Sequence, residues 1–315
     1  MSGGTEAILA KHESPTFARG LWRLADPKIS LASLASMALG AMAAAAHGPL
    51  HAGWLAATVA AVLAVELAKN ASGEIVDFDS GADLAVEAKD RTPFSGGKRV
   101  LVDGLLTRRQ TATIAVTAYV AAIGMGSLIA WLRAPGVAWL GLVGIGCAYF
   151  YHAEPFKLAY RGAGELAVGV CYGPLICSGT YLVQRLEFAP SLLWLSVPLG
   201  MLIAAFLWIN EFPDYSADLA SGKRTLVVAL GRARSSRVFC ALVAVPFAMV
   251  ALAPLSANIP LAVWIGLLGL PFGLAACRTT VRNPQTTAAL VPAQRNTLRA
   301  FVIYAVGAGL GLIAG

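Results

Sequence analysis

Two short stretches of carboxylates stand directly behind apolar runs. The segment NEFPDYSAD, residues 210–218, follows the run MLIAAFLWI, and GEIVDFDSGAD, residues 73–83, follows a second apolar run. Extended to residue 90, these stretches hold nine of the 17 acidic residues. Carboxylates beside hydrocarbon are costly and neighbouring like charges repel, so a cation must compensate them. The pattern therefore predicts a cation site at the ends of two apolar segments.

The second stretch has helical spacing. Asp214 and Asp218 are four residues apart, so on a helix both carboxylates lie on one face, and Asn210 lies one turn earlier on that face. Oxygen-only ligands suit Mg²⁺, which keeps some waters and is often shared between carboxylates and substrate phosphates. We therefore predict that this face binds Mg²⁺ together with a phosphate group.

The first stretch needs a bend to do the same. Asp77 and Asp83 are six residues apart, a spacing that a helix does not align, and Ser80-Gly81 between them supplies a place for the chain to turn. Basic residues follow both stretches. Carboxylate-bound Mg²⁺ surrounded by Lys and Arg is suited to holding a diphosphate and stabilising it as a leaving group. The candidate diphosphate-binding cations are Arg91, Lys98, Lys223 and Arg224.

The elements that position these residues are membrane helices. Hydrophobic residues make up 57% of the 315 residues and charged residues 13%, and the mean hydropathy is +0.69. A soluble domain carries about a quarter charged residues. An all-α integral membrane protein follows, with about nine spans of bilayer length. We expect them at 29–48, 53–69, 111–132, 137–152, 163–183, 190–210, 236–254, 259–277 and 297–315.

The basic residues predict the orientation. Alternate connections between the spans hold 22 of the 24 Lys and Arg residues. Such asymmetry marks the cytoplasmic side, so we expect a cytoplasmic N-terminus, an outside C-terminus and both acidic stretches facing the cytoplasm. The net charge of +7 reflects this topology, and no basic patch with interleaved aromatic residues indicates nucleic-acid binding. We predict a polar segment at 1–28 and one transmembrane domain at 29–315, made of two similar halves.

The sequence resembles the UbiA superfamily of membrane prenyltransferases. The segment NEFPDYSADLASGKRTLVVALGR is similar to the second aspartate motif of the family, GEIVDFDSGAD with DRTPFSGGKRV to the first, and YFYHAEPFKLAYRGAGEL to the segment between the halves. The similarity covers most of residues 60–305. The later segments, including GPLICSGTYLV, resemble the 1,4-dihydroxy-2-naphthoate polyprenyltransferase branch, which makes menaquinone precursors.

The resemblance implies a central cavity with Mg²⁺ and the diphosphate at its cytoplasmic end. It implies that Lys157 binds the diphosphate and that Tyr151 lies near the reacting carbon. It also implies a catalytic role for Asp77 and Asp214 and a ligand role for five residues: Asp77, Asp83, Asn210, Asp214 and Asp218.

One position departs from the family. The first motif commonly begins with Asn, where this chain has Gly73. Either the amide of Asn70 compensates, so that Gly73→Asn is tolerated, or Gly73 makes room for a bulky group. Three further residues or segments have two interpretations each. His152 is a general base or a spacer, Glu165 is a partner of Arg161 or orients substrate, and the loop 94–100 is a linker or a cap over the site.

Three functions compete. The first is Mg²⁺-dependent transfer of a prenyl group from a prenyl diphosphate to an aromatic acceptor, most simply 1,4-dihydroxy-2-naphthoate, within the bilayer. The second is a UbiA-type terpene cyclase, which shares the metal site but lets the double bonds of the tail capture the cation. The third is a transporter with acidic ion sites. The position of the carboxylates at span ends rather than at mid-span argues against transport.

Overall fold

The chain is helical throughout the residues that the computed structural model describes, 16–256 and 259–315, where no strand occurs. Eight helical segments are long and apolar enough to cross a bilayer. A ninth apolar helix, α6 (Val137–Phe150), has 14 residues. At 1.5 Å per residue it extends about 21 Å, less than the roughly 30 Å of a hydrocarbon core. The nine predicted spans thus correspond to eight full spans and one short helix of an integral membrane protein.

Six of the spans consist of one long α-helix each, and two are composite. The composite spans are α7 (Gly164–Val170) continued through η3 (Cys171–Leu175) into α8 (Ile176–Arg185), and η5 (Leu261–Gly269) continued into α12 (Leu270–Arg282). Pro174 lies in η3, a π-helical turn, where its missing N–H interrupts the regular helical ladder. The single helices are α2 (Pro27–Ala45), α3 (Ala52–Asp79), α5 (Arg108–Leu132), α9 (Leu193–Ala220), α11 (Arg232–Ser256) and α13 (Thr287–Ala314). The short η4 (Pro190–Leu192) precedes α9 in its span.

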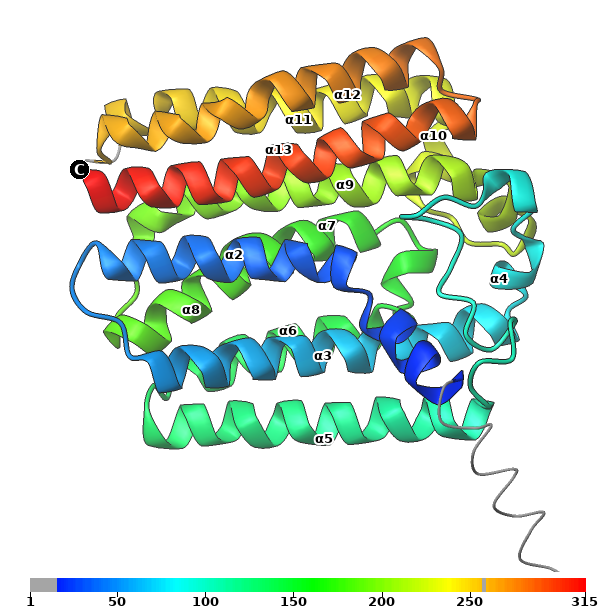
Figure 1. Cartoon of the computed structure of the whole chain (residues 1–315), viewed down its shortest axis with the longest axis horizontal. Coiled ribbons are helices and arrows are strands. Elements are labelled where there is room, and N and C mark those ends of the chain that lie inside the picture. The colour runs from blue at the N-terminus through cyan, green and yellow to red at the C-terminus, as the bar shows by residue number, and fades with distance from the viewer. Residues whose placement is uncertain (1–15, 257–258) are drawn as a thin grey trace, which may run out of the picture.

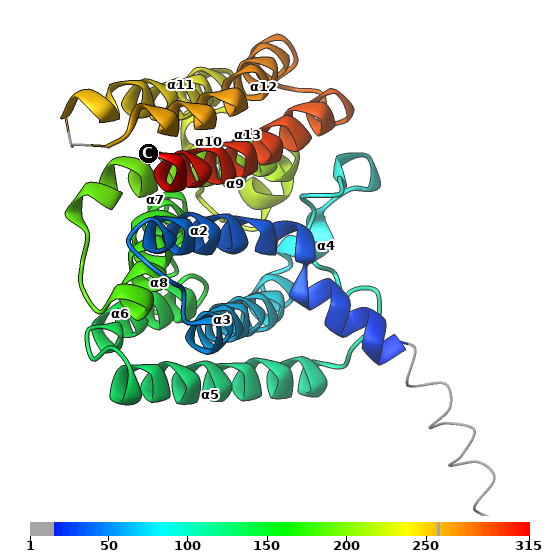
Figure 2. The ribbon, with the colours of Figure 1, turned by 60° about the vertical axis from the view of Figure 1, so that its left-hand side comes forward.

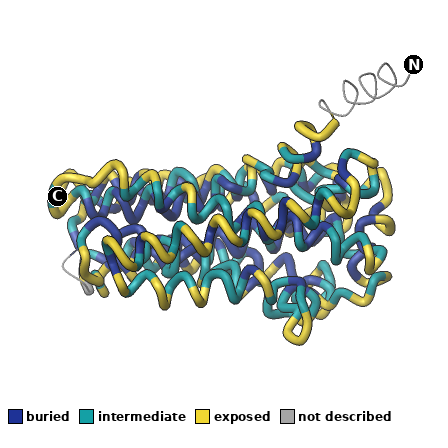
Figure 3. The backbone as a smooth tube through the Cα atoms, turned by 90° about the horizontal axis from the view of Figure 1, so that it is seen from below, coloured by how far each residue is buried: buried dark blue, intermediate teal, exposed yellow. Residues whose placement is uncertain are grey.

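The helices lie side by side in a bundle (Figures 1 and 2). The first span, α2, packs against α13 and α8; α3 packs against α5; and α9 runs through the middle in contact with α7, α11 and α13. The main core includes Leu39, Leu199, Phe239 and Phe301, all fully buried. Figure 3 shows buried positions along the inside of the bundle and exposed ones along its outside. Large apolar residues such as Trp131 point outward, as contact with lipid requires.

The polar motifs meet at one end of this bundle. Short elements gather there, on the right in Figure 1: α4 (Ala82–Ala85), η1 (Ala88–Asp90), η2 (Leu158–Tyr160) and α10 (Leu226–Leu230). The predicted spans 53–69 and 190–210 stop ten residues before α3 and α9 end. These two boundaries were wrong, because the helices continue beyond their apolar stretches and carry both acidic motifs on their final turns.

The segment before the first span is not simply a polar tail. Residues 1–15 of the predicted segment 1–28 lie outside the described residues, but 16–25 form a helix against the motif end of the bundle. Leu24 is fully buried in a small cluster with Ala71, Val100 and Leu106. This helix therefore packs against the part of α3 near the first motif and against the loop that follows that motif. The division of 29–315 into two similar halves stays a prediction.

Candidate active site

A cavity of about 580 Å³ lies at the motif end of the bundle, between the last turns of α3 and α9. Residues 140 positions apart in the sequence share its wall, because the two helices end at the same level. Ten of the residues that the sequence singled out line it: Asn70, Asp77, Asp83, Arg91, Lys98, Tyr151, Asn210, Asp214, Asp218 and Lys223.

The second motif presents its polar groups from one continuous helix. Asp214 and Asp218 both lie on α9, at the predicted spacing, and Asp218 is 4% exposed. The chain turns immediately after α9 and returns the ammonium of Lys223 to 3.6 Å from Asp218 Oδ1. Burial opposes the charge on Lys223, but Asp218 and Asp77 outweigh it and hold the pKa of Lys223 well above its usual value. Lys223 is thus a fixed cation on the cavity wall.

The first motif reaches the cavity through a bend, as the sequence predicted. Helix α3 ends at Asp79, Gly81 follows in the left-handed region at φ 80°, and α4 then turns Asp83 toward the cavity. Asp77 accepts a hydrogen bond of 2.7 Å from the hydroxyl of Tyr160. Asp79 pairs instead with Arg108 at 2.7 Å, where both side chains are exposed. Three of the four carboxylates of this motif, Glu74, Asp77 and Asp83, therefore line the cavity, and Asp79 does not.

The loop 94–100 closes over Asp83. A Cβ at Gly97 would lie 2.7 Å from Cγ of that residue, and Gly97 also has a positive φ of 76°. Arg99 donates a 2.6 Å hydrogen bond to the carbonyl oxygen of Asp83. Burial, followed by the charges of Asp77 and Glu74, raises the pKa of Asp83 to about 8. The loop therefore caps the site, and a cation beside Asp83 would favour its ionised form.

The residues fit a metal ion that a substrate helps to hold. Within the described ranges, no three acidic, His or Cys side chains come close enough to hold a metal by themselves. Yet Asp83 Oδ2, Asp214 Oδ1 and Asn210 Oδ1 are buried and lack a hydrogen-bond partner there. Mg²⁺ needs only one or two carboxylates when substrate phosphates and waters supply its remaining ligands. Unpartnered oxygens facing one cavity match that requirement.

Two of the candidate cations lie elsewhere. Lys157 does not line the cavity, and its ammonium pairs with Glu154 at 3.0 Å and lies 5.7 Å from the ring centroid of Tyr160. Arg224 is exposed, and its backbone N–H donates to the carbonyl of Tyr160. Lys98 lines the cavity while paired with Asp26. The structure therefore brings Lys223 directly against the carboxylates, whereas Lys157 and Arg224 stay at the rim.

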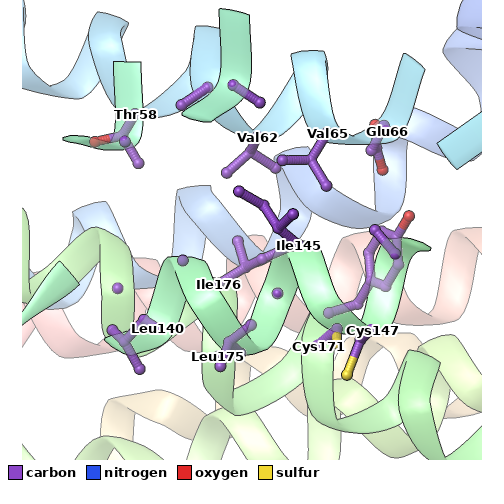
Figure 4. Close-up of a pocket in the computed structure, with 18 of the residues that line it drawn as sticks. Thr58, Val62, Val65, Glu66, Leu140, Ile145, Cys147, Cys171, Leu175 and Ile176 are labelled. Carbon is purple, nitrogen blue, oxygen red and sulfur yellow. The ribbon is translucent and has the colours of Figure 1, made fainter. Parts of the chain in front are cut away.

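A second, smaller pocket of about 170 Å³ continues into the bundle between α3, α5, α6 and the α7–α8 span (Figure 4). Apolar side chains such as Val62, Leu140 and Ile176 form most of its wall. Tyr151 and Lys69 line both this pocket and the larger cavity. A polar chamber for a charged group thus adjoins an apolar chamber, with these two side chains at the junction.

Known proteins share this architecture. The family model described as "UbiA prenyltransferase family" matches residues 33–306. The chain belongs to the UbiA prenyltransferase family. It is 31% identical over 261 residues to a 1,4-dihydroxy-2-naphthoate octaprenyltransferase of Mycobacterium tuberculosis, covering 83% of this chain and 84% of the relative. A Bacillus subtilis protein of the same name is 24% identical over 292 residues, covering 90% of each chain.

A solved structure has the same fold. A UbiA homolog from Archaeoglobus fulgidus, bound to GPP and Mg²⁺, superposes with a TM-score of 0.65 at 16% identity, covering 94% of this chain and all of that one. The present chain is accordingly a prenyltransferase of the UbiA family, and its relatives support the resemblance to the naphthoate branch.

In this UbiA prenyltransferase, the imidazole of His152 occupies the space beside Gly73. A Cβ at Gly73 would lie 2.7 Å from Nδ1 of His152, closer than real Cβ atoms approach. The amide of Asn70 donates to the carbonyl of Leu24 at 2.8 Å, so its N–H serves the N-terminal helix. The structure therefore favours the alternative in which Gly73 makes room, because Gly73→Asn would require the ring of His152 to move. Burial lowers the pKa of His152 to about 4, although Asp77 opposes that shift.

The sequence pattern did not single out several side chains at the site. The hydroxyl of Tyr160 donates a hydrogen bond to Asp77, and Lys69 lies at the junction of the two pockets. A charged residue inside an apolar run was the signal for Lys69. Glu165 does not pair with Arg161; it accepts a 2.7 Å hydrogen bond from the backbone N–H of Leu226 and so anchors α10.

Proposed function

We propose that this protein transfers a prenyl group from a prenyl diphosphate to an aromatic acceptor, with Mg²⁺ as cofactor. The observation that carries the proposal is the arrangement of the two acidic motifs across one polar cavity, which adjoins an apolar pocket at Tyr151 and Lys69. A prenyl diphosphate has the same division into a charged head and an apolar tail.

The four aspartates Asp77, Asp83, Asp214 and Asp218, with Asn210, would hold the metal. When bound, Mg²⁺ neutralises charge that develops on the leaving diphosphate. Lys223 binds the diphosphate oxygens from the cavity wall, where its ammonium is already fixed. The hydroxyl of Tyr160 orients Asp77.

The carbon–oxygen bond of the prenyl diphosphate breaks, and both electrons leave with the diphosphate. A carbon of the electron-rich acceptor ring attacks the allylic cation, and the ring then loses a proton into the anionic cavity. The ring face of Tyr151 at the junction stabilises the cation, and the apolar walls of the neighbouring pocket keep water from it.

The acceptor that we propose is 1,4-dihydroxy-2-naphthoate. Its support is the identity to relatives named as octaprenyltransferases of that compound, over more than four fifths of this chain. Product analysis separates this function from a terpene cyclase. Purified protein is supplied with prenyl diphosphates of several lengths, each paired with dihydroxynaphthoate, hydroxybenzoate or homogentisate, and the products are weighed by mass spectrometry. A prenylated naphthalene product supports the proposal, and a cyclised prenyl product without a ring acceptor contradicts it.

We propose further that the cavity opens to the cytoplasm, because 22 of 24 basic residues lie in connections on one side of the predicted topology. Cysteines introduced at Ser95 and Gly222 are expected to react with an impermeant reagent only from the cytoplasmic side, and cysteines at Leu50 and Glu187 only from the other. Labelling of positions 95 and 222 from opposite sides contradicts a shared site.

A further inference from the structure

The junction of the two pockets carries an unusual pair of charges, Glu66 and Lys69. Both lie on α3 and line the apolar pocket, and Glu66 is 6% exposed. Figure 4 shows Glu66 in line with Val62 and Val65 along the face of α3 toward that pocket. Carboxylates at this depth in a membrane protein are expensive and mark functional sites.

Within the described part of the chain, the carboxylate of Glu66 lacks a hydrogen-bond donor at normal distance and angle. Both of its carboxylate oxygens are buried and lack a hydrogen-bond partner among the described residues. Lys69 lies one turn further along α3, and the phenol of Tyr172 lies near Glu66, but neither forms a hydrogen bond of normal length and angle with its carboxylate. A buried carboxylate without hydrogen bonds costs free energy, so a donor from outside the chain is the missing partner.

Lys69 stands in aromatic surroundings. Its ammonium lies 5.5 Å from the ring centroid of Tyr151 and 5.9 Å from that of Tyr172. Such contacts hold the ammonium in place and leave its hydrogen-bond donors free for an anion. The site thus offers a cation and a hydrogen-bond acceptor within one turn of a helix, beside an apolar chamber for a flat ring.

We propose that Lys69 and Glu66 form the binding site for an aromatic acid that carries a ring hydroxyl. Lys69 binds the carboxylate of the ligand, Glu66 accepts a hydrogen bond from its hydroxyl, and the ring lies against the apolar wall. This inference rests on the proposed function and specifies its acceptor by chemistry. The hydrogen bond to Glu66 also raises the electron density of the ring that attacks the prenyl cation.

Binding of three fluorescent naphthalenes to the full chain in nanodiscs tests the site without turnover. The probes are 1-hydroxy-2-naphthoate, 2-naphthoate and 1-naphthol, which carry both groups, the carboxylate alone and the hydroxyl alone. The variants are Lys69→Met and Glu66→Gln. Ser72→Ala is the matched control, because Ser72 lies on the same helix and lines neither pocket.

Lys69→Met is expected to weaken binding of both carboxylates at least tenfold and to leave 1-naphthol unchanged. Glu66→Gln is expected to weaken the binding of 1-naphthol about threefold or more, because the hydroxyl loses a charged acceptor. It is expected to strengthen the binding of 2-naphthoate, because it removes a charge of the same sign as the probe. The control is expected to bind all three probes as the wild type does. The opposite signs for Glu66→Gln distinguish a ligand site from a merely structural charge pair.

Two results overturn the inference. One is that Lys69→Met weakens the binding of a non-reactive prenyl thiolodiphosphate as much as the binding of the naphthoates. That result would place Lys69 in the diphosphate site. The other is unchanged binding of every probe in both variants. If the variants change probe binding as expected but the wild type forms no prenylated ring, the proposed function is contradicted and the binding site is supported. If prenylation proceeds and these changes in probe binding are absent, the site fails while the function stands.

Discussion

The first acidic motif lies on α3 and the second on α9, and the protein surrounds these helices to very different degrees. In the most apolar stretch of α9, 72% of the residues are buried, against 17% in that of α3. Helix α9 carries its carboxylates on the last two turns of one continuous helix, whereas the first motif bends at Gly81 and the loop 94–100 packs against Asp83. The second motif is therefore positioned by a single helix. The geometry of the first motif depends on the packing of a bend and a loop as well as on charge.

The largest effects are expected from removing the carboxylates themselves. Asp77→Ala, Asp214→Ala and Asp218→Ala are each expected to lower turnover by about 100-fold or more, because each removes charge that the metal and leaving group need. Asp79→Ala is the matched control within the first motif, since Asp79 forms an exposed pair with Arg108 and exposed pairs contribute little. Turnover is measured by product mass spectrometry. A loss at Asp79 equal to that at Asp77 contradicts the placement of Asp79 outside the site.

A side chain added at Gly73 of the first motif is expected to have the next largest effect on turnover. Gly73→Asn places its side chain where the ring of His152 lies, and overpacking of this kind costs about 1–3 kcal/mol. We expect a drop in turnover of tenfold or more, and recovery when Gly73→Asn is combined with His152→Ala. Gly53→Asn on the same helix is the control, because no atom lies within 4 Å of a Cβ there. Gly73→Asn with wild-type turnover contradicts the role of Gly73 as space for His152.

The loop over Asp83 provides a third test. Gly97→Ala is expected to displace that carboxylate and to lower turnover several-fold, while binding of naphthalene probes stays unchanged. Gly104→Ala has the same positive φ strain, at 64° against 76°, but open space around its Cβ. If the two variants lose turnover equally, backbone strain and not the contact with Asp83 is responsible.

The two asparagines are expected to differ, with the smallest effects of the series. Asn210 has a buried, unpartnered oxygen in the cavity, so Asn210→Ala is expected to raise the KM for prenyl diphosphate a few-fold. Asn70 donates to the carbonyl of Leu24, so Asn70→Ala is expected to lower the Tm and cost about 0.5–1.5 kcal/mol of stability. A KM effect at Asn70 larger than that at Asn210 reverses this comparison.

The sequence predicted what depends on local pattern. The apolar runs predicted the helices, and the spacing of Asp214 and Asp218 predicted their common face on α9. The bend predicted at Ser80-Gly81 is present, with Gly81 in the left-handed region. The family resemblance implied the central cavity, and the structure places both motifs around one cavity at one end of the bundle.

What the sequence did not give depends on contacts between distant segments. The helical continuation of α3 and α9 past residues 69 and 210 is set by packing and not by hydropathy. The filling of Gly73 by His152 joins residues 79 positions apart, and no spacing rule predicts it. The displacement of Lys157 to the rim depends on a loop conformation that the motif alone does not specify.

The central claim is that both motifs hold one Mg²⁺–diphosphate ligand across a single cavity. Calorimetric titration of the purified full chain with non-reactive geranyl thiolodiphosphate tests it most directly, using wild type, Asp77→Ala, Asp214→Ala and the double variant, each with Mg²⁺ or with excess chelator. We predict that wild-type affinity falls at least tenfold in chelator, that each single variant loses as much, and that the double variant loses little more. Tight binding in excess chelator, or wild-type affinity in either single variant, contradicts a shared site.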